Sequence, residues 1–368
     1  MFRSEWKGRK VKNEKLERML EKKETTLIEA MERLDKTGKG ILFIVDEEEQ
    51  VIGTLTDGDV RRWLLKCGDI HSDVGMVMRR NPRIIRQDDK VDPYEYMEQQ
   101  RIDAVPVVNP EGKIVDIVYR TYHYENKSVK NKALKNVPIV IMAGGKGTRL
   151  YPYTKILPKP LIPIGDIPII ERIMNKFYEY GATEFFITVN YKQEMMRAYF
   201  AEANLPYGIK YVKEDKPLGT AGSIRLITEE FRQPLIITNC DILIETSYDA
   251  LVEYHLESGN DMTIVSSLKN TKLPYGVIHC KEGSLVQSIE EKPTYSNFIN
   301  TGMYIINPEY IKWIPENKMY HMTDLAKKML DSNKKIGMYP ISENSFLDMG
   351  QFEELKRMEE IIGGGKTN

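Results

Sequence analysis

The sequence predicts an α/β protein in which a doubly wound, mostly parallel mixed sheet follows a smaller α+β module. From residue 138 onward, short apolar runs alternate with stretches of helical periodicity, the pattern of a sheet covered by helices on both faces. Between residues 25 and 126, a helix–strand–turn–strand pattern occurs twice, 63 residues apart. At 368 residues, the chain has room for two or three domains of roughly 100 to 200 residues each.

Residues 1–24 are expected to form a basic N-terminal arm. They hold nine Lys or Arg against five Glu, with Leu16, Met19 and Leu20 at helical spacing. This pattern favours a solvated helix, and a basic tail that binds a partner is the alternative.

The repeated module at 25–126 is predicted from two matching sets of elements. In the first copy they are a helix face at 27–34 and strands at 41–45 and 51–55; in the second they are a helix at 94–100 and strands at 104–108 and 114–118. This duplication resembles a pair of CBS modules, which commonly hold adenine nucleotides between them.

By that resemblance, in the stretch 53–61 Thr56 binds phosphate and Asp59 binds ribose hydroxyls. Tyr119 and Tyr122 stand at the matching positions of the second copy. We therefore expect at most one site for an adenine nucleotide effector. A purely structural dimerisation module without a ligand is the alternative.

Residues 127–137 are expected to link the two modules, because four lysines stand there among polar neighbours without apolar periodicity. The second module is then expected over 138–362, and 363–368 form a tail. The predicted strands of this module are 139–142, 184–189, 209–212, 235–238, 263–267, 276–279 and 303–306. The predicted helices are 169–180, 193–202, 221–231, 248–257, 323–330 and 352–362.

The most informative stretch of the second module is 139–163. The apolar run 139–142 is predicted as a strand buried on both faces, and it enters a loop with three glycines at 144–147, where backbone N–H groups can approach a polyphosphate. Arg149 and, ten residues later, Lys159 add two cations. Prolines around Lys159 prevent a regular helix, so we expect it on an extended arm that folds back over the loop.

Two better-known phosphate loops do not fit this stretch. A Walker loop needs Ser or Thr after its Gly-Lys, whereas Lys146 is followed by Gly147, and a dinucleotide fingerprint needs Gly or Ala where Leu150 stands. The motif Gly-Gly-x-Gly-Thr-Arg-Leu, followed ten residues after its Arg by Lys-Pro-Leu-Ile-Pro, instead resembles the sugar-1-phosphate nucleotidyltransferases. That resemblance implies a Rossmann-like fold and the synthesis of nucleotide sugars.

The resemblance also implies roles for residues along the whole module. Residues expected to contact the nucleotide are Ala143, Gly144, Gly145, Gly147, Thr148, Glu214, Pro217, Gly219 and Thr220. Those expected to line the sugar pocket are Tyr275, Gly276, Glu291, Thr301 and Gly302. Those expected to act in catalysis are Arg149, Lys159 and Lys292, and those expected to bind Mg²⁺ are Asp241 and Asp348. The stretch 214–222 follows a strand and opens a helix, so its backbone is expected to be free to bond a nucleobase.

The implied reaction needs charge neutralisation rather than a protein base. A phosphate monoester has a second pKa of roughly 6, so the attacking sugar phosphate is already dianionic at neutral pH. Arg149, Lys159 and Lys292 would position the two polyanions, together with Mg²⁺ held by two carboxylates, phosphate oxygens and waters.

The expected substrates are GTP and a hexose 1-phosphate, because Pro-Leu-Gly-Thr-Ala-Gly at 217–222 is similar to the loop of guanylyltransferases. With the CBS pair, the pattern looks like the glucosamine-1-phosphate guanylyltransferases of legionaminic acid synthesis. A mannose- or glucose-1-phosphate enzyme using GTP or UTP is the alternative, and a choline-phosphate cytidylyltransferase is more remote. From another class, the alternative is a catalytically silent nucleotide sensor; retention of both cations and both carboxylates argues against it.

Composition gives no sign of a nucleic acid or membrane partner. Lys plus Arg number 53 and Asp plus Glu 54, for a formal net charge of −1. No run of roughly 18 apolar residues could span a bilayer, and the N-terminus lacks the apolar core of a signal peptide. The three cysteines are too few and scattered for a disulfide framework. We expect a cytoplasmic enzyme, and we expect it to form a homo-oligomer.

Overall fold

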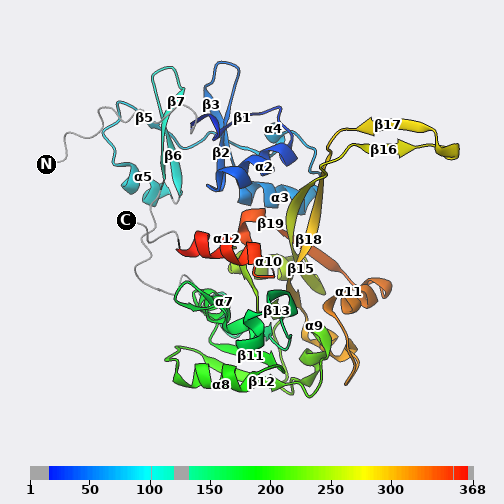
Figure 1. Cartoon of the computed structure of the whole chain (residues 1–368). Coiled ribbons are helices and arrows are strands. Elements are labelled where there is room, and N and C mark those ends of the chain that lie inside the picture. The colour runs from blue at the N-terminus through cyan, green and yellow to red at the C-terminus, as the bar shows by residue number, and fades with distance from the viewer. Residues whose placement is uncertain (1–15, 101, 120–131, 351, 364–368) are drawn as a thin grey trace. The chain divides into compact units, whose positions relative to one another are not determined.

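The computed structural model describes residues 16–100, 102–119, 132–350 and 352–363. The chain divides into two compact units, residues 1–125 and 126–368, and each is described by itself (Figure 1). Most of the expected basic arm, the start of the expected linker, the end of the tail, and Tyr122 lie outside the described residues.

The first unit is built from two small sheets with short helices. Its elements are β1 (Leu20–Lys22), α2 (Leu27–Thr37), β2 (Ile41–Val45), β3 (Val51–Thr56), α3 (Asp57–Cys67), α4 (Val74–Val77), β4 (Arg79–Arg80), β5 (Ile85–Arg86), α5 (Pro93–Gln100), β6 (Ala104–Val108) and β7 (Ile114–Tyr119). The sheet orders are β1-β2-β3-β4 and β5-β6-β7. In each sheet an antiparallel hairpin pairs, through its first strand, with a short parallel strand.

The two hairpins of this unit match one another in detail, as an internal duplication predicts. Each has a register shift at the last residue of its first strand. Each turn has a left-handed residue at the equivalent position, Glu49 with φ 63° and Gly112 with φ 83°. Gln50 and Lys113, which are equivalent residues, form a bridge with one another. Pairing between equivalent positions is what approximate twofold symmetry requires, so the copies face each other about a local axis.

The second unit is built on a large mixed sheet. Its strands are β8 (Ile139–Met142), β9 (Pro163–Ile164), β10 (Ile167–Pro168), β11 (Glu184–Val189), β12 (Gly208–Lys213), β13 (Leu235–Asn239), β14 (Ile242–Ile244), β15 (Met262–Lys272), β16 (Val277–Cys280), β17 (Val286–Glu290), β18 (Thr294–Ile306), β19 (Ile336–Ile341) and β20 (Phe346–Asp348). Its α-helices are α6 (Tyr153–Ile156), α7 (Ile169–Tyr178), α8 (Gln193–Glu202), α9 (Gly219–Gly222), α10 (Tyr248–Glu257), α11 (Met322–Asp331) and α12 (Phe352–Gly363). Its 3₁₀ turns are η1 (Thr148–Leu150), η2 (Lys159–Leu161), η3 (Ser223–Leu226), η4 (Glu282–Ser284), η5 (Pro308–Trp313) and η6 (Glu343–Ser345).

The large sheet has the order β12-β11-β8-β13-β18-β15-β19. The neighbours from β12 to β13 are parallel, β18 is antiparallel to both of its neighbours, and β15 and β19 are parallel. The predicted mostly parallel mixed sheet is therefore confirmed. Because β11 and β12 follow β8 on one side and β13 lies on its other side, the strand order reverses beside β8. Ligands gather at the carboxyl ends of strands at such a switch point.

Helices pack on both faces of this sheet, as predicted (Figure 1). On one face, Val140 and Met142 of β8 belong to a core cluster that includes Leu325 and Met329 of α11. On the other face, the ring of Phe177 in α7 lies 6.5 Å from Phe185 of β11 and 4.7 Å from Tyr248 of α10. Within the described residues, no helix is both long and apolar enough to cross a membrane.

Three local expectations differ from the structure. The described end of the expected basic arm is not a solvated helix, because β1 pairs with β2 and Met19 is buried in the core of the first unit. The predicted helix at 221–231 is wrong, because only α9 and η3 form there and the chain from Ile227 to the start of β13 is irregular. Tertiary bonds explain this: the amides of Ala221 and Gly222 donate to the carbonyl of Tyr320 rather than continuing a helix. The described end of the expected linker belongs to the second unit, since Leu134 is fully buried and its amide donates to the Tyr180 carbonyl.

Candidate functional site

The glycine loop leaves β8 at the switch point and is held close to two other segments. Gly147 has φ 64°, and a Cβ there would lie 3.0 Å from the side chains of both Thr154 and Lys159. A Cβ on Gly144 would collide with the Glu214 carboxylate. Glycine is therefore required at both positions for the loop to approach these segments.

The segment from residue 152 to Lys159 is fastened from two sides. The Thr154 hydroxyl donates to the Gly147 carbonyl at 2.8 Å, and the Tyr191 hydroxyl donates to the Thr154 carbonyl at 3.3 Å. Lys192 Nζ donates to the last two carbonyls of α6, both at 2.5 Å. An extended arm was expected here; the structure has the single turns α6 and η2 instead, and Lys159 opens η2. Tyr191 and Lys192 were not among the predicted site residues, because bonds to backbone carbonyls leave no sequence motif.

Two carboxylates far apart in the sequence meet through a small sheet. β14 pairs with β20 so that Asp348 lies opposite the first residue of β14, and Asp241 directly precedes that residue. The amide after Asp348 donates to the Asp241 carbonyl at 2.8 Å. Lys159 and Asp241 form an ion pair whose side chains are only 9% and 13% exposed. The structure thus brings together one predicted cation and both predicted metal ligands.

Arg149 completes this cluster. A Cβ on Gly350 would lie 3.0 Å from the Asp348 carboxylate and 3.2 Å from the Arg149 guanidinium, so both groups border the same glycine. Burial, followed by the charge of Asp241, raises the pKa of Asp348, while Lys159 and Arg149 act in the opposite direction. Two crowded carboxylates beside two cations form a site that suits an additional cation and several phosphate oxygens.

The oxygen donors of this cluster fit Mg²⁺. Among the described residues, no group of three or more His, Cys, Asp and Glu side chains gathers as a metal site. The protein would therefore supply Asp241 and Asp348, and phosphate oxygens and waters would complete an octahedron, which is how Mg²⁺ is usually bound. Because Lys159 is already paired with Asp241, the ion would share that carboxylate with the ammonium group.

Glu214 lies between the glycine loop and the expected base-binding loop. The Glu214 side chain is buried, and burial raises the pKa of its carboxyl group. The Leu218 amide donates a hydrogen bond to this carboxylate at 3.2 Å, which acts in the opposite direction and lowers the pKa. The backbone carbonyl of Glu214 accepts a bond from the Asn190 side chain at 2.8 Å. Asn190, Tyr191 and Lys192 therefore hold both loops from one short segment after β11.

The backbone of the expected base-binding loop is less available than predicted. The amides of Ala221 and Gly222 donate to the Tyr320 carbonyl at 2.9 and 3.1 Å, and the Thr220 hydroxyl accepts from the Met322 amide at 3.0 Å. Gly219 has φ 77°, and a Cβ there would lie 2.6 Å from the same carbonyl. These groups fasten the loop to the start of α11. The predicted nucleotide contacts Gly145, Thr148 and Pro217 are exposed.

A cavity of about 380 Å³ opens beside the carboxylates. The predicted site residues that line it are Thr220, Thr301, Gly302 and Asp348. The lining residues that sequence reasoning missed are Asn239, Ile242, Ile299, Asn300, Tyr304, His321, Thr323 and Phe346. Asn239 could have been found, since it ends the strand that precedes Asp241. Gly302, with φ 89°, leaves room for the Asn239 amide, which a Cβ would strike.

Three predicted sugar-site residues and the predicted catalytic Lys292 do not line this cavity. Tyr275, Gly276, Glu291 and Lys292 lie at the base of the β16–β17 hairpin. The Glu291 and Lys292 side chains are 72% and 57% exposed and lie 3.8 Å apart, and Lys292 has φ 48°. A Cβ on Gly276 would lie 3.0 Å from the Glu291 carboxylate. The structure therefore groups these four residues with one another and not with the carboxylate cluster.

In the first unit, Thr56 and Asp59 form the capping box of α3. The Asp59 amide donates to the Thr56 hydroxyl at 3.2 Å, and the Thr56 amide donates to the Asp59 carboxylate at 3.0 Å. Asp59 is 5% exposed and also binds Arg62 and Arg79. In the second copy, burial raises the pKa of Tyr119 to about 12. The two groups expected to bind a nucleotide are thus already bonded within the unit.

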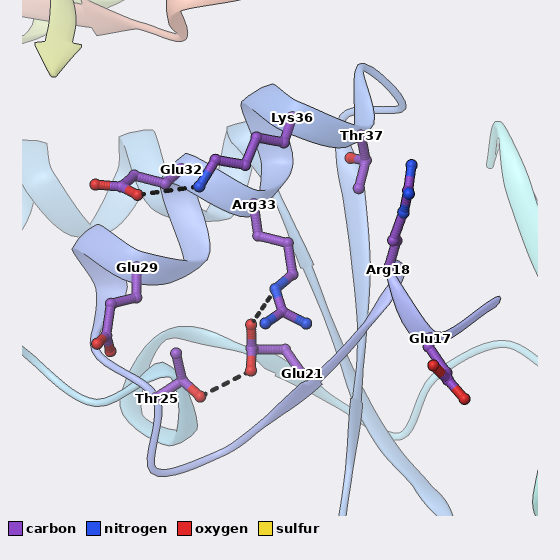
Figure 2. A pocket seen from close by; sticks show the side chains of 9 residues that line it. All are labelled: Glu17, Arg18, Glu21, Thr25, Glu29, Glu32, Arg33, Lys36 and Thr37. Carbon is purple, nitrogen blue, oxygen red and sulfur yellow. Dashed lines mark hydrogen bonds and ion pairs between the residues drawn. The ribbon is translucent and has the colours of Figure 1, made fainter. Parts of the chain in front are cut away.

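A second hollow, of about 1010 Å³, lies beside α2 in the first unit (Figure 2). It is lined by Glu17, Arg18, Glu21, Thr25, Glu29, Glu32, Arg33, Lys36 and Thr37. Figure 2 shows Arg33 and Glu21 pointing toward each other, with Arg33 Nε 2.8 Å from the carboxylate. Four acidic and three basic side chains leave no excess of positive charge, so this hollow does not suit a polyphosphate.

Comparisons with known proteins show which proteins the chain is similar to. The chain is 33% identical over 221 residues to a mannose-1-phosphate guanyltransferase of Debaryomyces hansenii, covering 58% of this chain and 60% of that protein. It is 32% identical over 221 residues to the protein of the same name from Saccharomyces cerevisiae, covering 58% of this chain and 61% of that protein. The chain thus spans about 60% of the length of these curated relatives.

Among solved structures, HddC from Yersinia pseudotuberculosis complexed with GMP-PN is 24% identical, with a TM-score of 0.48, over 61% of this chain and 99% of that chain. The family model for CBS domains matches residues 22–66, which contain the first copy of the repeat. The family model for nucleotidyl transferases matches residues 139–363, well over half of the chain and all of the carboxylate cluster. The chain therefore belongs to the nucleotidyl transferase family.

Proposed function

We propose that the chain is a sugar-1-phosphate guanylyltransferase, which transfers GMP from GTP to a hexose 1-phosphate and releases pyrophosphate. One observation carries the proposal: Arg149, Lys159, Asp241 and Asp348 gather at the switch point, beside the glycine loop and a cavity of about 380 Å³. Two cations and two carboxylates at this place are what phosphoryl transfer between two polyanions needs.

The reaction follows from the same groups. An oxygen of the sugar 1-phosphate bonds to the α-phosphorus, the bond to the bridging oxygen of pyrophosphate breaks, and the electron pair leaves with pyrophosphate. No protein base is needed, because the attacking phosphate is ionised at neutral pH. Arg149 and Lys159 would hold the triphosphate in line and neutralise the departing charge. Mg²⁺ bound by Asp241 and Asp348 would supply further positive charge at the α-phosphate.

The substrate is proposed from the names of the relatives and from the side chains that line the cavity. The relatives named above are mannose-1-phosphate guanyltransferases, which favours GTP and a hexose 1-phosphate. The neutral side chains of Asn239, Asn300 and Thr323 line the cavity and suit sugar hydroxyls. Within this class our named candidate is glucosamine 1-phosphate, for legionaminic acid synthesis, because a CBS pair precedes the transferase; mannose or glucose 1-phosphate is the alternative. A cytoplasmic location and dependence on Mg²⁺ stay predictions.

The test is a screen of four nucleoside triphosphates against mannose, glucose and glucosamine 1-phosphates, read by pyrophosphate release. We expect release with GTP that requires a sugar 1-phosphate, and a nucleotide sugar of the matching mass. Asp348→Asn, prepared identically, controls for contaminating enzymes. Release without any sugar phosphate, or the same rate in Asp348→Asn, would overturn the proposed reaction. A preference for UTP would overturn only the choice of base.

We also propose that one adenine nucleotide binds at the first copy of the repeat, through Thr56 and Asp59. Both groups would have to exchange capping-box bonds for bonds to the nucleotide. Calorimetry of the full chain with AMP, ADP and ATP should show one site, lost in Asp59→Ala and kept in Tyr119→Phe. Two equivalent sites, or binding that survives Asp59→Ala, would contradict this assignment.

A further inference from the structure

Thr154 is a fully buried polar residue in the segment that joins the glycine loop to Lys159. It is 0% exposed, although it lies between Arg149 and Lys159 in the sequence. Burying a hydroxyl group is unfavourable unless it is hydrogen-bonded, and the Thr154 hydroxyl donates to the Gly147 carbonyl at 2.8 Å. Because Thr154 has no surface that a substrate could touch, any effect that it has on the reaction must pass through the group to which it bonds.

The Gly147 carbonyl is held by two hydrogen bonds. Besides the Thr154 hydroxyl, the Leu150 amide donates to it at 3.0 Å, and this bond closes the single turn η1 that presents Arg149. Gly147 has φ 64° and ψ 35°, and glycine can leave such a conformation more easily than any other residue. The Thr154 hydroxyl therefore supplies a restraint on the loop that the glycine itself lacks.

This restraint also sets the direction of the next amide in the loop. A peptide group is planar and trans, so its C=O and its N–H point in opposite directions. Because the Gly147 carbonyl points toward Thr154, the Thr148 amide of the same peptide group points away from it. Thr148 is exposed, and its amide donates to no acceptor among the described residues. This amide is therefore available to a phosphate oxygen, as the amides of glycine-rich loops commonly are.

Thr154 is itself held in place by groups outside the loop. The Tyr191 hydroxyl donates to the Thr154 carbonyl at 3.3 Å. A Cβ on Gly147 would lie 3.0 Å from both the Thr154 methyl group and Lys159 Cβ, so the same glycine packs against the stem of the second cation. Thr154 thus lies where the glycine loop and Lys159 are fixed relative to each other.

We propose that Thr154 is a positioning residue for the transfer reaction: by holding the Gly147 carbonyl, it orients the Thr148 amide and Arg149 toward the triphosphate. This inference rests on the proposed function, in which those two groups face the nucleotide. Donors that are already oriented stabilise developing charge without reorganising during the reaction. A catalytic group displaced by about 1 Å can cost about 100-fold in rate, so a single buried hydroxyl can have a large effect.

The experiment compares Thr154→Val with Thr154→Ser in the full chain. Valine has nearly the shape of threonine but cannot donate a hydrogen bond, so kcat for pyrophosphate release from GTP and a sugar 1-phosphate should fall about 10- to 100-fold. The affinity for GTP alone, measured by calorimetry, should fall about 10-fold, because the hydrogen bond from the Thr148 amide to a charged phosphate weakens. Thr154→Ser keeps the hydroxyl group and should retain most of both quantities.

Thr263→Val is the matched control. Thr263 is also a fully buried threonine, and its hydroxyl group bonds to His255 Nδ1 of α10 at 2.8 Å. Each valine variant loses one buried hydroxyl group, so the two should lower the melting temperature by similar amounts. Thr263→Val should nevertheless keep the wild-type kcat and GTP affinity, because its hydroxyl group holds no part of the glycine loop.

Three results would overturn the role of Thr154: a Thr154→Val variant with the wild-type kcat and GTP affinity, equal losses in Thr154→Ser, or equal losses in Thr263→Val. The proposed function is judged separately, by pyrophosphate release in the wild type. A wild-type chain that binds GTP but releases no pyrophosphate would refute that function, and the GTP affinities of the variants would still decide the role of Thr154. A wild-type chain that does not bind GTP would overturn both.

Discussion

Replacing Asp241 by Asn is expected to destabilise the second unit even before any substrate binds. Lys159 and Asp241 form an ion pair with side chains that are 9% and 13% exposed. Asn keeps the shape of Asp but not its charge, so the Lys159 ammonium is left buried without its charged partner. Removing one partner of a buried pair typically costs about 3 to 5 kcal/mol of unfolding free energy.

The charge of Asp348 determines how much unfolding free energy Asp241→Asn loses within the range of about 3 to 5 kcal/mol. Lys159 already lowers the pKa of Asp348, against burial and the charge of Asp241, which raise it. Without the Asp241 charge, Asp348 ionises more readily and replaces part of the lost attraction. We therefore expect about 3 kcal/mol, the lower end of the range. For a domain of 150 to 250 residues this lowers the melting temperature by about 6 to 12 °C.

The assay is thermal unfolding without nucleotide or metal, applied to wild type, Asp241→Asn, Lys159→Met and the double variant. The double variant should recover most of the loss, because it leaves no buried unpaired charge. If Asp241→Asn melts within about 2 °C of wild type, or if the two single effects simply add, the ion pair does not stabilise the unit as argued.

Three further expectations follow from the same unit. Asp348→Asn should lower turnover by more than the roughly 10- to 100-fold typical of residues that act through another ligand; near-normal pyrophosphate release would remove it from the metal site. Lys192→Met should lower the unfolding free energy by about 1 kcal/mol and reduce kcat, because it frees two carbonyls of α6. The control, Lys155→Met, removes a nearby charge but neither bond and should change little. Equal effects of the two variants would refute the role of Lys192 in holding α6. Burial lowers the pKa of His255 from its ordinary 6.5, so the unfolded chain binds the proton more readily. The stability that neutral His255 contributes should be fully present above pH 6.5 and should fall below it, by at most about 1.4 kcal/mol of unfolding free energy per pH unit. Urea unfolding of wild type and His255→Gln measures this difference, and identical pH profiles of the two would contradict it.

Much of the second unit could be predicted because its signals are local. The strand at 184–189 and the helices at 193–202 and 248–257 begin and end where predicted. Continuous apolar runs mark strands buried on both faces, and a 3.6-residue period marks helices. The helix expected at 221–231 failed because bonds to a segment about a hundred residues later decide the backbone there, and no local pattern reports them.

The carboxylate cluster could be predicted only through a resemblance. Arg149, Lys159, Asp241 and Asp348 belong to motifs, and the structure brings them together. The three-residue strands β14 and β20, which join the two carboxylates, were not predicted, because each is too short to show periodicity. Lys292 belongs to a motif as clear as the others, yet the structure leaves it exposed at the base of the β16–β17 hairpin.

The pairing of β14 with β20 has a consequence for how the protein is made. Asp241 and Asp348 are separated by 107 positions (348 − 241), and they meet only when these two strands pair. Chains emerge from the ribosome N-terminal part first, and domains fold as they appear. The glycine loop, Lys159 and Asp241 can all be in place on a nascent chain that still lacks the second carboxylate. The complete cluster can therefore arise only after residue 348 has been added, so a chain truncated between β19 and β20 would keep much of the large sheet but lack the second carboxylate.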